Sequence, residues 1–133
     1  MTVTLRDHAS EVIRSPVIVG PDETLRDVSC TLWRESIGAA IVGSIDEAVG
    51  IISERDVVAE LAQGADADSV TAERAMTGVI VAARPGDRLL DVIFLMLAEG
   101  VRHIPVVDEA GTVTGMVSVR DLLRPLLVEA LTE

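Results

Sequence analysis

The sequence contains no lysine and no tyrosine, and it has a single tryptophan and a single phenylalanine. All eleven basic side chains are therefore arginines, and they are set against 22 Asp and Glu residues, for a net charge of −11. A protein of that charge repels phosphate backbones. So few aromatic rings also leave almost no surface on which single-stranded bases could stack. We therefore expect no nucleic-acid partner.

Cysteine and long hydrophobic runs are also scarce. The single cysteine, Cys30, cannot form an internal disulfide, which fits a reducing compartment such as the cytoplasm. Its spacing puts it on the apolar stripe of an expected helix, so we interpret it as a small core residue. No apolar run approaches the roughly 18 residues that cross a bilayer, and the N-terminus lacks the pattern of a secretory signal. We expect a cytoplasmic protein with no membrane partner.

A seven-residue pattern occurs twice: Gly-Ile-Ile-Ser-Glu-Arg-Asp at 50–56 and Gly-Met-Val-Ser-Val-Arg-Asp at 115–121. In each copy two apolar residues follow the glycine, as in a short buried strand. The serine can then accept hydrogen bonds from the unpaired N–H groups of a new helix. The aspartate lies in the first helical turn, where negative charge is favourable. Taken alone, either copy predicts a capping box.

The surrounding residues repeat as well. Val17-Ile18-Val19 matches Val79-Ile80-Val81, and other pairs recur at a spacing of 64 residues: Pro21 with Pro85, Leu25 with Leu89, Asp27 with Asp91, Val28 with Val92, and Ile37 with Val101. A period this long predicts two copies of one supersecondary unit. We place the first copy at 1–64 and the second at 65–133.

Each copy reads strand–helix–strand–strand–helix, with a short helix before it. The elements expected in the first copy are a helix over 5–13, a strand over 17–19, a helix capped by Thr24 to about 35, strands over 39–42 and 49–52, and a helix from 54 to about 64. Those expected in the second copy are a helix over 70–76, a strand over 79–81, a helix over 88–99, strands over 103–107 and 113–117, and a last helix. Neither copy can bury its own sheet, so we expect an α+β fold in which two β-α-β-β-α repeats pack sheet to sheet with pseudo-two-fold symmetry.

Local details are also predicted. Trp33 is expected on the apolar face of the helix after Thr24, and Gly38 in a left-handed conformation just past its end. The helix after Ser53 is expected to bury Val57, Val58 and Leu61. The segment 65–69 reads as an exposed acidic link. Pro125 falls inside the last helix, which it should kink or split.

These residues resemble a known family. The paired pattern, closing two β-α-β-β-α units, looks like a tandem cystathionine-β-synthase (CBS) domain pair, or Bateman module. Val-Arg-His-Ile-Pro-Val-Val-Asp at 101–108 is similar to the family's second-strand signature. The first copy, at 37–43, keeps the apolar pattern but lacks the Pro, Arg and His. The resemblance covers essentially the whole chain, which resembles the stand-alone bacterial pairs.

The resemblance implies that an adenosine-containing nucleotide (AMP, ADP or ATP) binds in the clefts between the repeats, with S-adenosylmethionine or NAD as alternatives. In the family the motif Asp binds the ribose hydroxyls and the motif Ser lies near phosphate or ribose. Adenine lies against the first strands. The candidate ligand-binding residues are therefore Ser118, Asp121, Arg102, His103, Arg120, Val17, Val19, Ser53, Asp56, Arg55, Val79 and Val81. No catalytic residue, metal or required cofactor is implied.

The charges beside the two motifs differ. The second motif has three basic neighbours, which are Arg102, His103 and Arg120. The first has Arg55, but Gly and Ala stand where the second has Arg and His. Because charge-assisted hydrogen bonds are about twice as strong as neutral ones, we expect the Asp121 cleft to be the better phosphate site. The Asp56 cleft is expected to be empty or to recruit Arg84.

Three functional classes remain in competition. The first is a regulatory ligand-sensing module that acts on an unknown partner protein. The second is a ligand-independent scaffold for protein–protein interaction, in which Asp56 and Asp121 serve only as caps. The third is a hydrolase that uses Ser53 or Ser118, which we disfavour because no histidine lies at a sequence position that implies a relay. His8 has no Cys or acidic cluster at ligand spacing, so no zinc site is expected.

The helix expected over 88–99 is apolar on nearly every side. Its packing stripe is formed by Leu89, Val92, Ile93, Met96 and Leu97, and Leu90, Phe94 and Leu95 are apolar as well. A large apolar surface is unusual on a small monomer. Part of this helix should therefore face a second chain, and a two-fold homodimer is the expected assembly.

Overall fold

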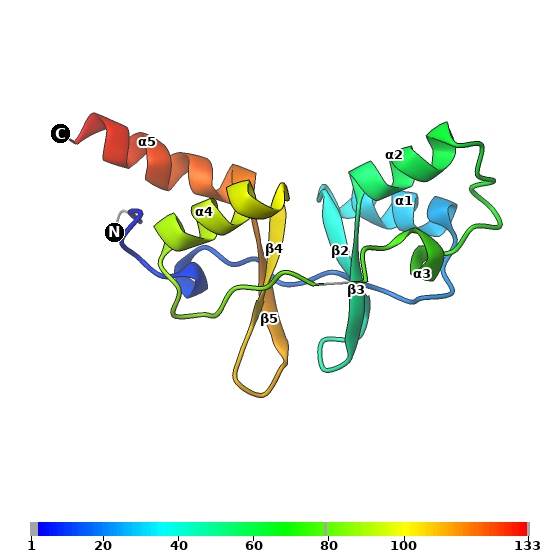
Figure 1. Ribbon diagram of the computed structural model, residues 1–133, viewed down its shortest axis with the longest axis horizontal. Helices are drawn as coiled ribbons and strands as arrows, with labels where there is room; N and C mark the ends of the chain where they lie inside the picture. Colours follow the sequence, from blue (N-terminus) through cyan, green and yellow to red (C-terminus); the bar gives the residue numbers. More distant parts are fainter. Residues whose placement is uncertain (1–2, 79, 133) are drawn as a thin grey trace. The chain divides into compact units, whose positions relative to one another are not determined.

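The computed structural model describes residues 3–78 and 80–132, and the chain divides into two compact units. The first-motif unit is Val17–Ile80, and the second-motif unit combines Met1–Pro16 with Val81–Glu133. Each unit contains a sheet and helices (Figure 1), so the predicted α+β class with two related units is confirmed. The packing of one sheet on the other stays a prediction.

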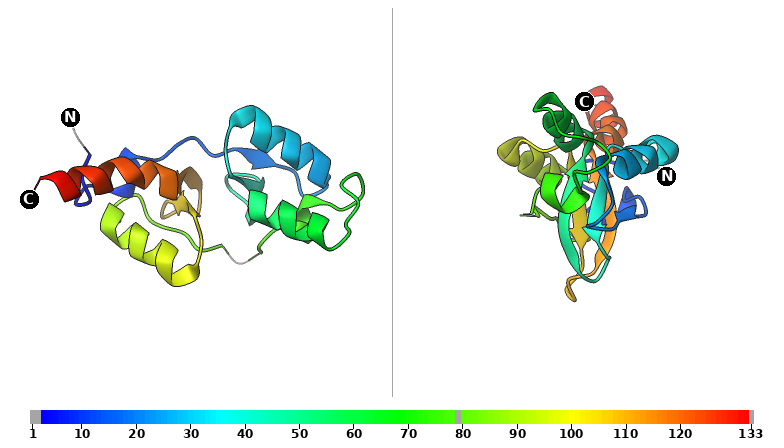
Figure 2. Two further views of the ribbon diagram at one scale, coloured as in Figure 1. Left: turned by 90° about the horizontal axis from the view of Figure 1, so that it is seen from above. Right: turned by 90° about the vertical axis from the view of Figure 1, so that its right-hand side faces the viewer.

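The first-motif unit has the predicted element order. Its elements are β1 (Ile18–Val19), α1 (Leu25–Glu35), β2 (Ala39–Gly43), β3 (Ala48–Ser53), α2 (Glu54–Ala62) and α3 (Ala72–Ala75). The sheet order is β1-β2-β3, with β1 parallel to β2 and β2 antiparallel to β3. Figure 2 shows α1 and α2 side by side, and the two helices are in contact.

Helix α1 begins where the sequence predicts. The Thr24 hydroxyl accepts from the Asp27 N–H at 3.2 Å, and the Asp27 carboxylate accepts from the Thr24 N–H at 3.1 Å, which completes a capping box. The helix buries one apolar stripe made of Leu25, Val28 and Leu32. Trp33 was expected on this stripe, but it is 86% exposed because it lies one position, about 100°, away from Leu32. The left-handed residue at the helix end is Ser36 (φ 54°) and not Gly38.

Two further burial predictions in this unit are wrong. Helix α2 buries Val57, whereas Val58 and Leu61 are exposed. Cys30 is exposed and is therefore not a core residue. The apolar face of a short helix that covers one side of a sheet is narrow, so apolar residues beside its central stripe face outward.

The second-motif unit repeats most of this arrangement. Its elements are η1 (Ala9–Glu11), α4 (Leu89–Glu99), β4 (His103–Val107), β5 (Val113–Ser118), η2 (Val119–Leu122) and α5 (Leu123–Leu131). Strands β4 and β5 form an antiparallel pair, and α4 packs against η2. The predicted strands over 103–107 and 113–117 are confirmed, the second with one more residue.

The strand predicted over 79–81 is absent at the two of these residues that the structure describes. Val79 lies outside the described residues, and neither Ile80 nor Val81 is in a strand. The parallel pairing occurs instead at Ala83, which bridges Val106. In the first-motif unit Val19 pairs with Val42 in the same way, 64 residues earlier. The repeat of 17–19 is therefore 81–83. The run at 79–81 matches 17–19 in sequence only because short Val/Ile runs resemble one another wherever they lie.

The two terminal helices also differ from expectation. The opening helix predicted over 5–13 is reduced to the 3₁₀ turn η1. The last helix is split as predicted, but ahead of Pro125: a 3₁₀ segment ends at Leu122, and α5 begins at Leu123. Proline cannot donate to the carbonyl of Asp121, four residues earlier, so the α-helical pattern starts only in the turn that contains the proline.

Each unit is completed by the segment that precedes the other repeat. Arg14 and Met116 exchange two backbone hydrogen bonds of 3.0 Å, and Thr77 and Ile51 exchange two of 2.9 and 3.0 Å. Leu5 and Ala9 belong to the core around α4, β4 and β5, and Ala72 belongs to the core around α1, β2 and β3. The repeats predicted at 1–64 and 65–133 stay a description of the sequence duplication, because the compact units exchange these leading segments.

The glycine of each motif makes that exchange possible. A Cβ atom on Gly50 would lie 2.8 Å from the Thr77 carbonyl oxygen and 2.5 Å from the Met76 sulfur. A Cβ atom on Gly115 would lie 3.0 Å from the Arg14 carbonyl oxygen and 2.7 Å from Cβ of Ile13. These separations are too short for carbon contacts. Both positions therefore require glycine because the leading segment passes directly over the motif strand.

The segment 65–69, predicted as an exposed link, also forms hydrogen bonds with the start of α1. Leu25 N–H donates to the Val70 carbonyl at 2.9 Å, and Arg26 N–H donates to that of Ala67 at 3.0 Å. The Arg26 guanidinium forms a two-bond ion pair with Asp68, in which Nη2 donates to Oδ2 at 3.1 Å. These contacts return the chain to the start of α1 and place α3 in the core.

Gly50→Ala and Gly115→Ala should each lower the free energy of unfolding by about 1–3 kcal/mol, because the added methyl group overpacks a backbone contact. Urea denaturation measures this loss. Gly86→Ala is the matched control, since its Cβ would meet no atom within 4 Å and its φ is not positive. Equal losses in all three variants would contradict the close approach.

Asp68→Asn should lower the unfolding free energy of the protein at neutral pH but not at strongly acidic pH. The pKa of Asp68 is lowered because Arg26 donates a hydrogen bond to it, and burial opposes that shift. A carboxylate whose pKa is lowered on folding stabilises the fold above its unfolded pKa, and this contribution is lost as the pH falls through its folded pKa. The two proteins should therefore differ slightly in unfolding free energy at neutral pH and converge below the ordinary value of 3.8. Asp22→Asn, an exposed acid in a turn, is the control, and a pH-independent difference would refute the pairing.

Candidate functional site

The first motif joins β3 to α2 through a complete capping box. Oδ2 of Asp56 accepts from the Ser53 N–H at 2.8 Å and from the Ser53 hydroxyl at 3.1 Å. The Ser53 oxygen in turn accepts from the Asp56 N–H at 3.3 Å. The predicted cap is therefore confirmed. Within residues 3–78 and 80–132, the second carboxylate oxygen, Oδ1 of Asp56, has no hydrogen-bond partner.

The second motif has the same cap on a different helix start. Oδ2 of Asp121 accepts from the Ser118 N–H at 2.9 Å and from the Ser118 hydroxyl at 3.0 Å, and the Ser118 oxygen accepts from the Asp121 N–H at 3.2 Å. The segment that follows is the four-residue 3₁₀ helix η2, whereas the first motif opens a nine-residue α-helix. The expected row of helix N–H donors for a phosphate is therefore present only after Ser53.

The second oxygen of Asp121 is already engaged. Nε of Arg14 donates to Oδ1 of Asp121 at 2.7 Å. The Asp121 side chain is only 6% exposed, whereas that of Arg14 is 69% exposed. In the first-motif unit Thr77 takes the place of Arg14, because it forms the equivalent backbone bridge to the motif strand. A ribose diol would therefore find Oδ1 free at Asp56, whereas at Asp121 Arg14 already occupies one of the two acceptor sites of Oδ1 and the side chain is nearly buried.

The basic residues predicted for the second motif do gather beside it. The β4–β5 register places His103 directly opposite Ser118, and the Val119 N–H donates to the Arg102 carbonyl at 2.8 Å. Arg102 and Arg120 are exposed. At the corresponding positions of the first motif, Ala39 lies opposite Ser53, and Arg55 is exposed. The difference in charge between the two motifs is thus retained in three dimensions.

The sequence grouped His103 with the second motif but did not pair it with Ser118, because the two residues are 15 positions apart and only the strand register joins them. The Ser118 hydroxyl donates to Asp121 and accepts from a backbone N–H, so its one proton is committed to the cap. A serine held in this way is a poor candidate nucleophile.

The first-strand candidates are only partly retained. Val17 is half-buried and its carbonyl accepts from the Ile41 N–H at 2.8 Å, while Val19 is buried in the core. Val81 is the half-buried counterpart of Val17, and the counterpart of Val19 is the buried Ala83, which sequence reasoning did not select. A strict 64-residue offset, as in Pro21 and Pro85, could have identified it. Val79 lies outside the described residues.

Two other findings bear on the kind of site. No group of three or more His, Cys, Asp or Glu residues in the described part of the chain could hold a metal ion. In the same part, no helix has the length and apolar character needed to span a membrane. Arg84 donates through Nη1 to the Asp108 carbonyl at 2.7 Å, inside its own unit.

Comparison with known proteins identifies the motif-bearing repeats. The family model described as "CBS domain" matches residues 9–63 and 72–128, which together make up most of the chain. An uncharacterised protein of Methanopyrus kandleri is 34% identical over 128 residues, which cover 92% of this chain and 65% of that protein. The present chain thus spans just under two thirds of that relative.

Solved structures give the same result. A CBS domain protein from Pyrobaculum aerophilum, complexed with AMP, is 30% identical with a TM-score of 0.82, covering 95% of this chain and 99% of that one. A CBS-domain-containing protein from Agrobacterium tumefaciens is 28% identical with a TM-score of 0.82, covering 91% and 94% of the two chains. Both likenesses extend over nearly the full length of the chain.

Proposed function

This chain belongs to the CBS domain family as a tandem pair, and on that premise we propose that it is a regulatory module that binds an adenosine-containing nucleotide and catalyses no reaction. The observation that carries the proposal is the match, over nearly its whole length, to a 30% identical protein bound to AMP. Both motifs are intact and correctly folded at strand–helix junctions, which supports the same conclusion.

In this proposal the two motif carboxylates bind ribose. Asp56 has one oxygen outside its cap, and that oxygen accepts a ribose hydroxyl. The N–H groups at the start of α2, with Ser53 and Arg55 beside them, favour the phosphate. At the second motif, Arg102, His103 and Arg120 provide donors around Asp121, and Ser118 holds that carboxylate in place through the cap. Val17 and Val81, which are both half-buried, supply aliphatic contacts for adenine.

The absence of catalysis is part of the proposal. Both motif serines donate to their own aspartate and accept from its N–H, so neither hydroxyl is available for attack. A sensor requires only a ligand that binds one conformation of the protein more tightly than another. The regulated partner is then a separate protein, and the single unpaired cysteine favours a cytoplasmic location. The high negative charge argues against a nucleic-acid partner.

The ligand proposal is tested by thermal or urea unfolding with and without AMP. A ligand present at 100 times its dissociation constant adds about 2.7 kcal/mol to the unfolding free energy. Asp56→Ala and Asp121→Ala should each lose part of the AMP-dependent gain, in addition to about 1 kcal/mol of intrinsic stability from the broken cap.

Asp27→Ala is the matched control, because it removes the same capping box from α1 but leaves both motifs intact. It should lose similar intrinsic stability and keep the full gain from AMP. A gain that falls equally in the Asp27 variant would mean that the caps act on stability alone. No gain with AMP, S-adenosylmethionine or NAD, together with co-purification of one protein, would favour the scaffold alternative.

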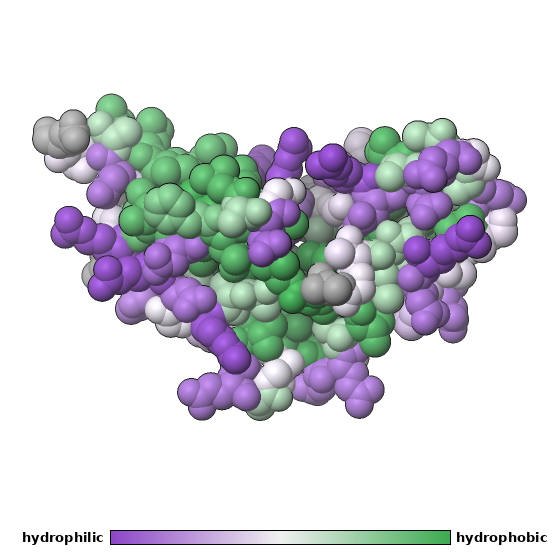
Figure 3. All heavy atoms as spheres, in the orientation of Figure 1, coloured by the Kyte–Doolittle hydropathy of each residue, from purple (hydrophilic) through white to green (hydrophobic). Residues whose placement is uncertain are grey.

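We also propose that two copies of the chain associate through the outer faces of their helices. Phe94 and Leu97 on α4 are 60% and 74% exposed. Their counterparts 64 residues earlier, Cys30 and Trp33, are exposed on α1. Figure 3 shows a largely hydrophobic surface over α4 and α5, which includes the exposed side chains Leu90, Phe94, Leu97, Leu123, Leu126, Leu127 and Leu131.

The same outward face is thus apolar in both units. Val58 and Leu61 on α2 are exposed, and so are their counterparts, Leu123 and Leu126, 65 residues later. A self-complementary face that occurs in each repeat suits a two-fold interface with a second copy better than one with an unrelated partner. The high net charge predicts that added salt strengthens this association.

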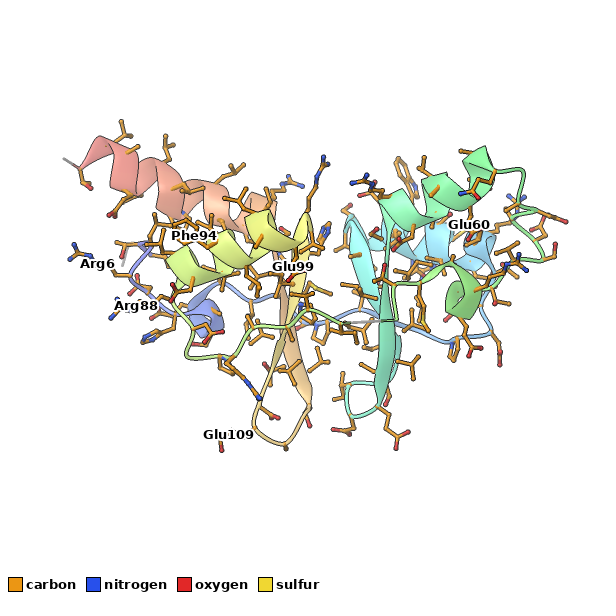
Figure 4. The ribbon with its side chains drawn as sticks, in the orientation of Figure 1. Arg6, Glu60, Arg88, Phe94, Glu99 and Glu109 are labelled. Carbon is orange, nitrogen blue, oxygen red and sulfur yellow. The ribbon has the colours of Figure 1, made fainter. Side chains whose placement is uncertain are left out.

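Phe94→Glu should weaken the homodimer by about 30-fold or more, because a central aromatic side chain is a typical hot spot of an interface. Phe94 is labelled on α4 in Figure 4. Sedimentation measures the dissociation constant, and the emission of Trp33, the single tryptophan, should shift to shorter wavelength as dilute protein is concentrated. Ile45→Glu, at an exposed turn residue, is the control. A wild-type chain that stays monomeric at all concentrations would rule out the dimer.

A further inference from the structure

The two motifs differ most in what contacts the aspartate outside its cap. Arg14 comes from the segment that crosses β5, 107 positions away from Asp121 in sequence. Its backbone is fixed by the bridge to Met116, and Gly115 allows that backbone to lie against the strand. The fold therefore places the base of the Arg14 side chain within reach of Asp121.

This contact engages the one carboxylate oxygen of Asp121 that the cap leaves open. Oδ2 is used by the cap, and Oδ1 by Arg14 at 2.7 Å. At Asp56, Oδ1 has no partner within the described residues, and Thr77 stands where an arginine would have to be. The two carboxylates therefore present different surfaces to an incoming diol, although their sequence motifs are alike.

We propose that Arg14 acts as an internal competitor for the ribose-binding oxygen of Asp121, so that the second motif binds a nucleoside only when Arg14 is displaced. A ribose hydroxyl is a neutral donor, and exchanging it for the guanidinium gives up a charge–charge attraction. The first motif imposes no such exchange. Arg14 is thus a specificity-determining residue that makes the Asp56 motif the first to accept a nucleoside. This inference rests on the proposed function.

The size of the effect follows from the exposure of Arg14. Its side chain is 69% exposed, so solvent weakens the pair even though Asp121 is nearly buried. Ion pairs with an exposed partner are worth little, and removing the competition should strengthen nucleoside binding at the second motif by about two- to fivefold.

The test isolates the second motif in an Asp56→Asn background, in which the amide oxygen can still accept the Ser53 N–H and keep the cap. AMP and adenosine are titrated calorimetrically into Asp56→Asn and into Asp56→Asn with Arg14→Ala. Arg14→Ala should tighten binding of both ligands by about two- to fivefold. Arg14→Lys, which keeps the charge as a single point, should give an intermediate value.

Two controls separate this effect from the loss of one positive charge. Arg6→Ala changes the net charge identically in the same N-terminal segment, where the Arg6 side chain points away from the fold (Figure 4), and it should leave binding unchanged. In an Asp121→Asn background, Arg14→Ala should give no gain. Urea unfolding of each variant checks that it is folded before titration.

The outcomes distinguish the two proposals. If AMP binds the parent protein but Arg14→Ala leaves the affinity unchanged, the competition is refuted and the proposed function stands. If Arg14→Ala weakens AMP while adenosine is unaffected, Arg14 is a phosphate-binding residue and the competition is again refuted. If AMP and adenosine bind to no variant and not to the parent, the proposed function fails and this inference fails with it.

Discussion

The backbone bridge between each motif strand and the segment leading into the other repeat is the interaction on which the rest of the structure depends. Arg14 bridges Met116, and Thr77 bridges Ile51. A side chain at the facing position would overpack either bridge, which accounts for the glycine that opens each motif. The bridges place distant segments in the two cores and decide how the chain divides into compact units.

The capping boxes build on this frame. In each motif a serine and an aspartate satisfy one another at the end of the strand and start the next helical segment. The same aspartate is the proposed ribose ligand, so one residue serves both stability and binding. A carboxylate can do this because it has two oxygens and the cap uses only one of them. The two motifs then differ in what contacts the other oxygen, Oδ1, which accepts from Arg14 only at Asp121.

Much of the fold was accessible from local pattern. The cap at Thr24, the two motif caps and the strands over 39–43 and 103–107 depend on neighbouring residues, and all lie where the sequence predicted them, to within a residue. The errors came where local pattern is ambiguous. The Val/Ile run at 79–81 looks like a strand, yet the sheet pairs at Ala83. Cys30 and Trp33 have helical spacing, yet they lie beside the buried stripe and not in it.

The sequence by itself determined the duplication, the strand–helix order of the first-motif unit, both capping boxes and the charge difference between the motifs. These features follow from residues a few positions apart, or from a repeat that can be counted. Only the tertiary structure decided that Arg14 reaches Asp121, that Thr77 forms the matching bridge in the first-motif unit, and that His103 is paired with Ser118. Such contacts join distant positions through strand register and chain crossing, and no local preference of the residues involved encodes them.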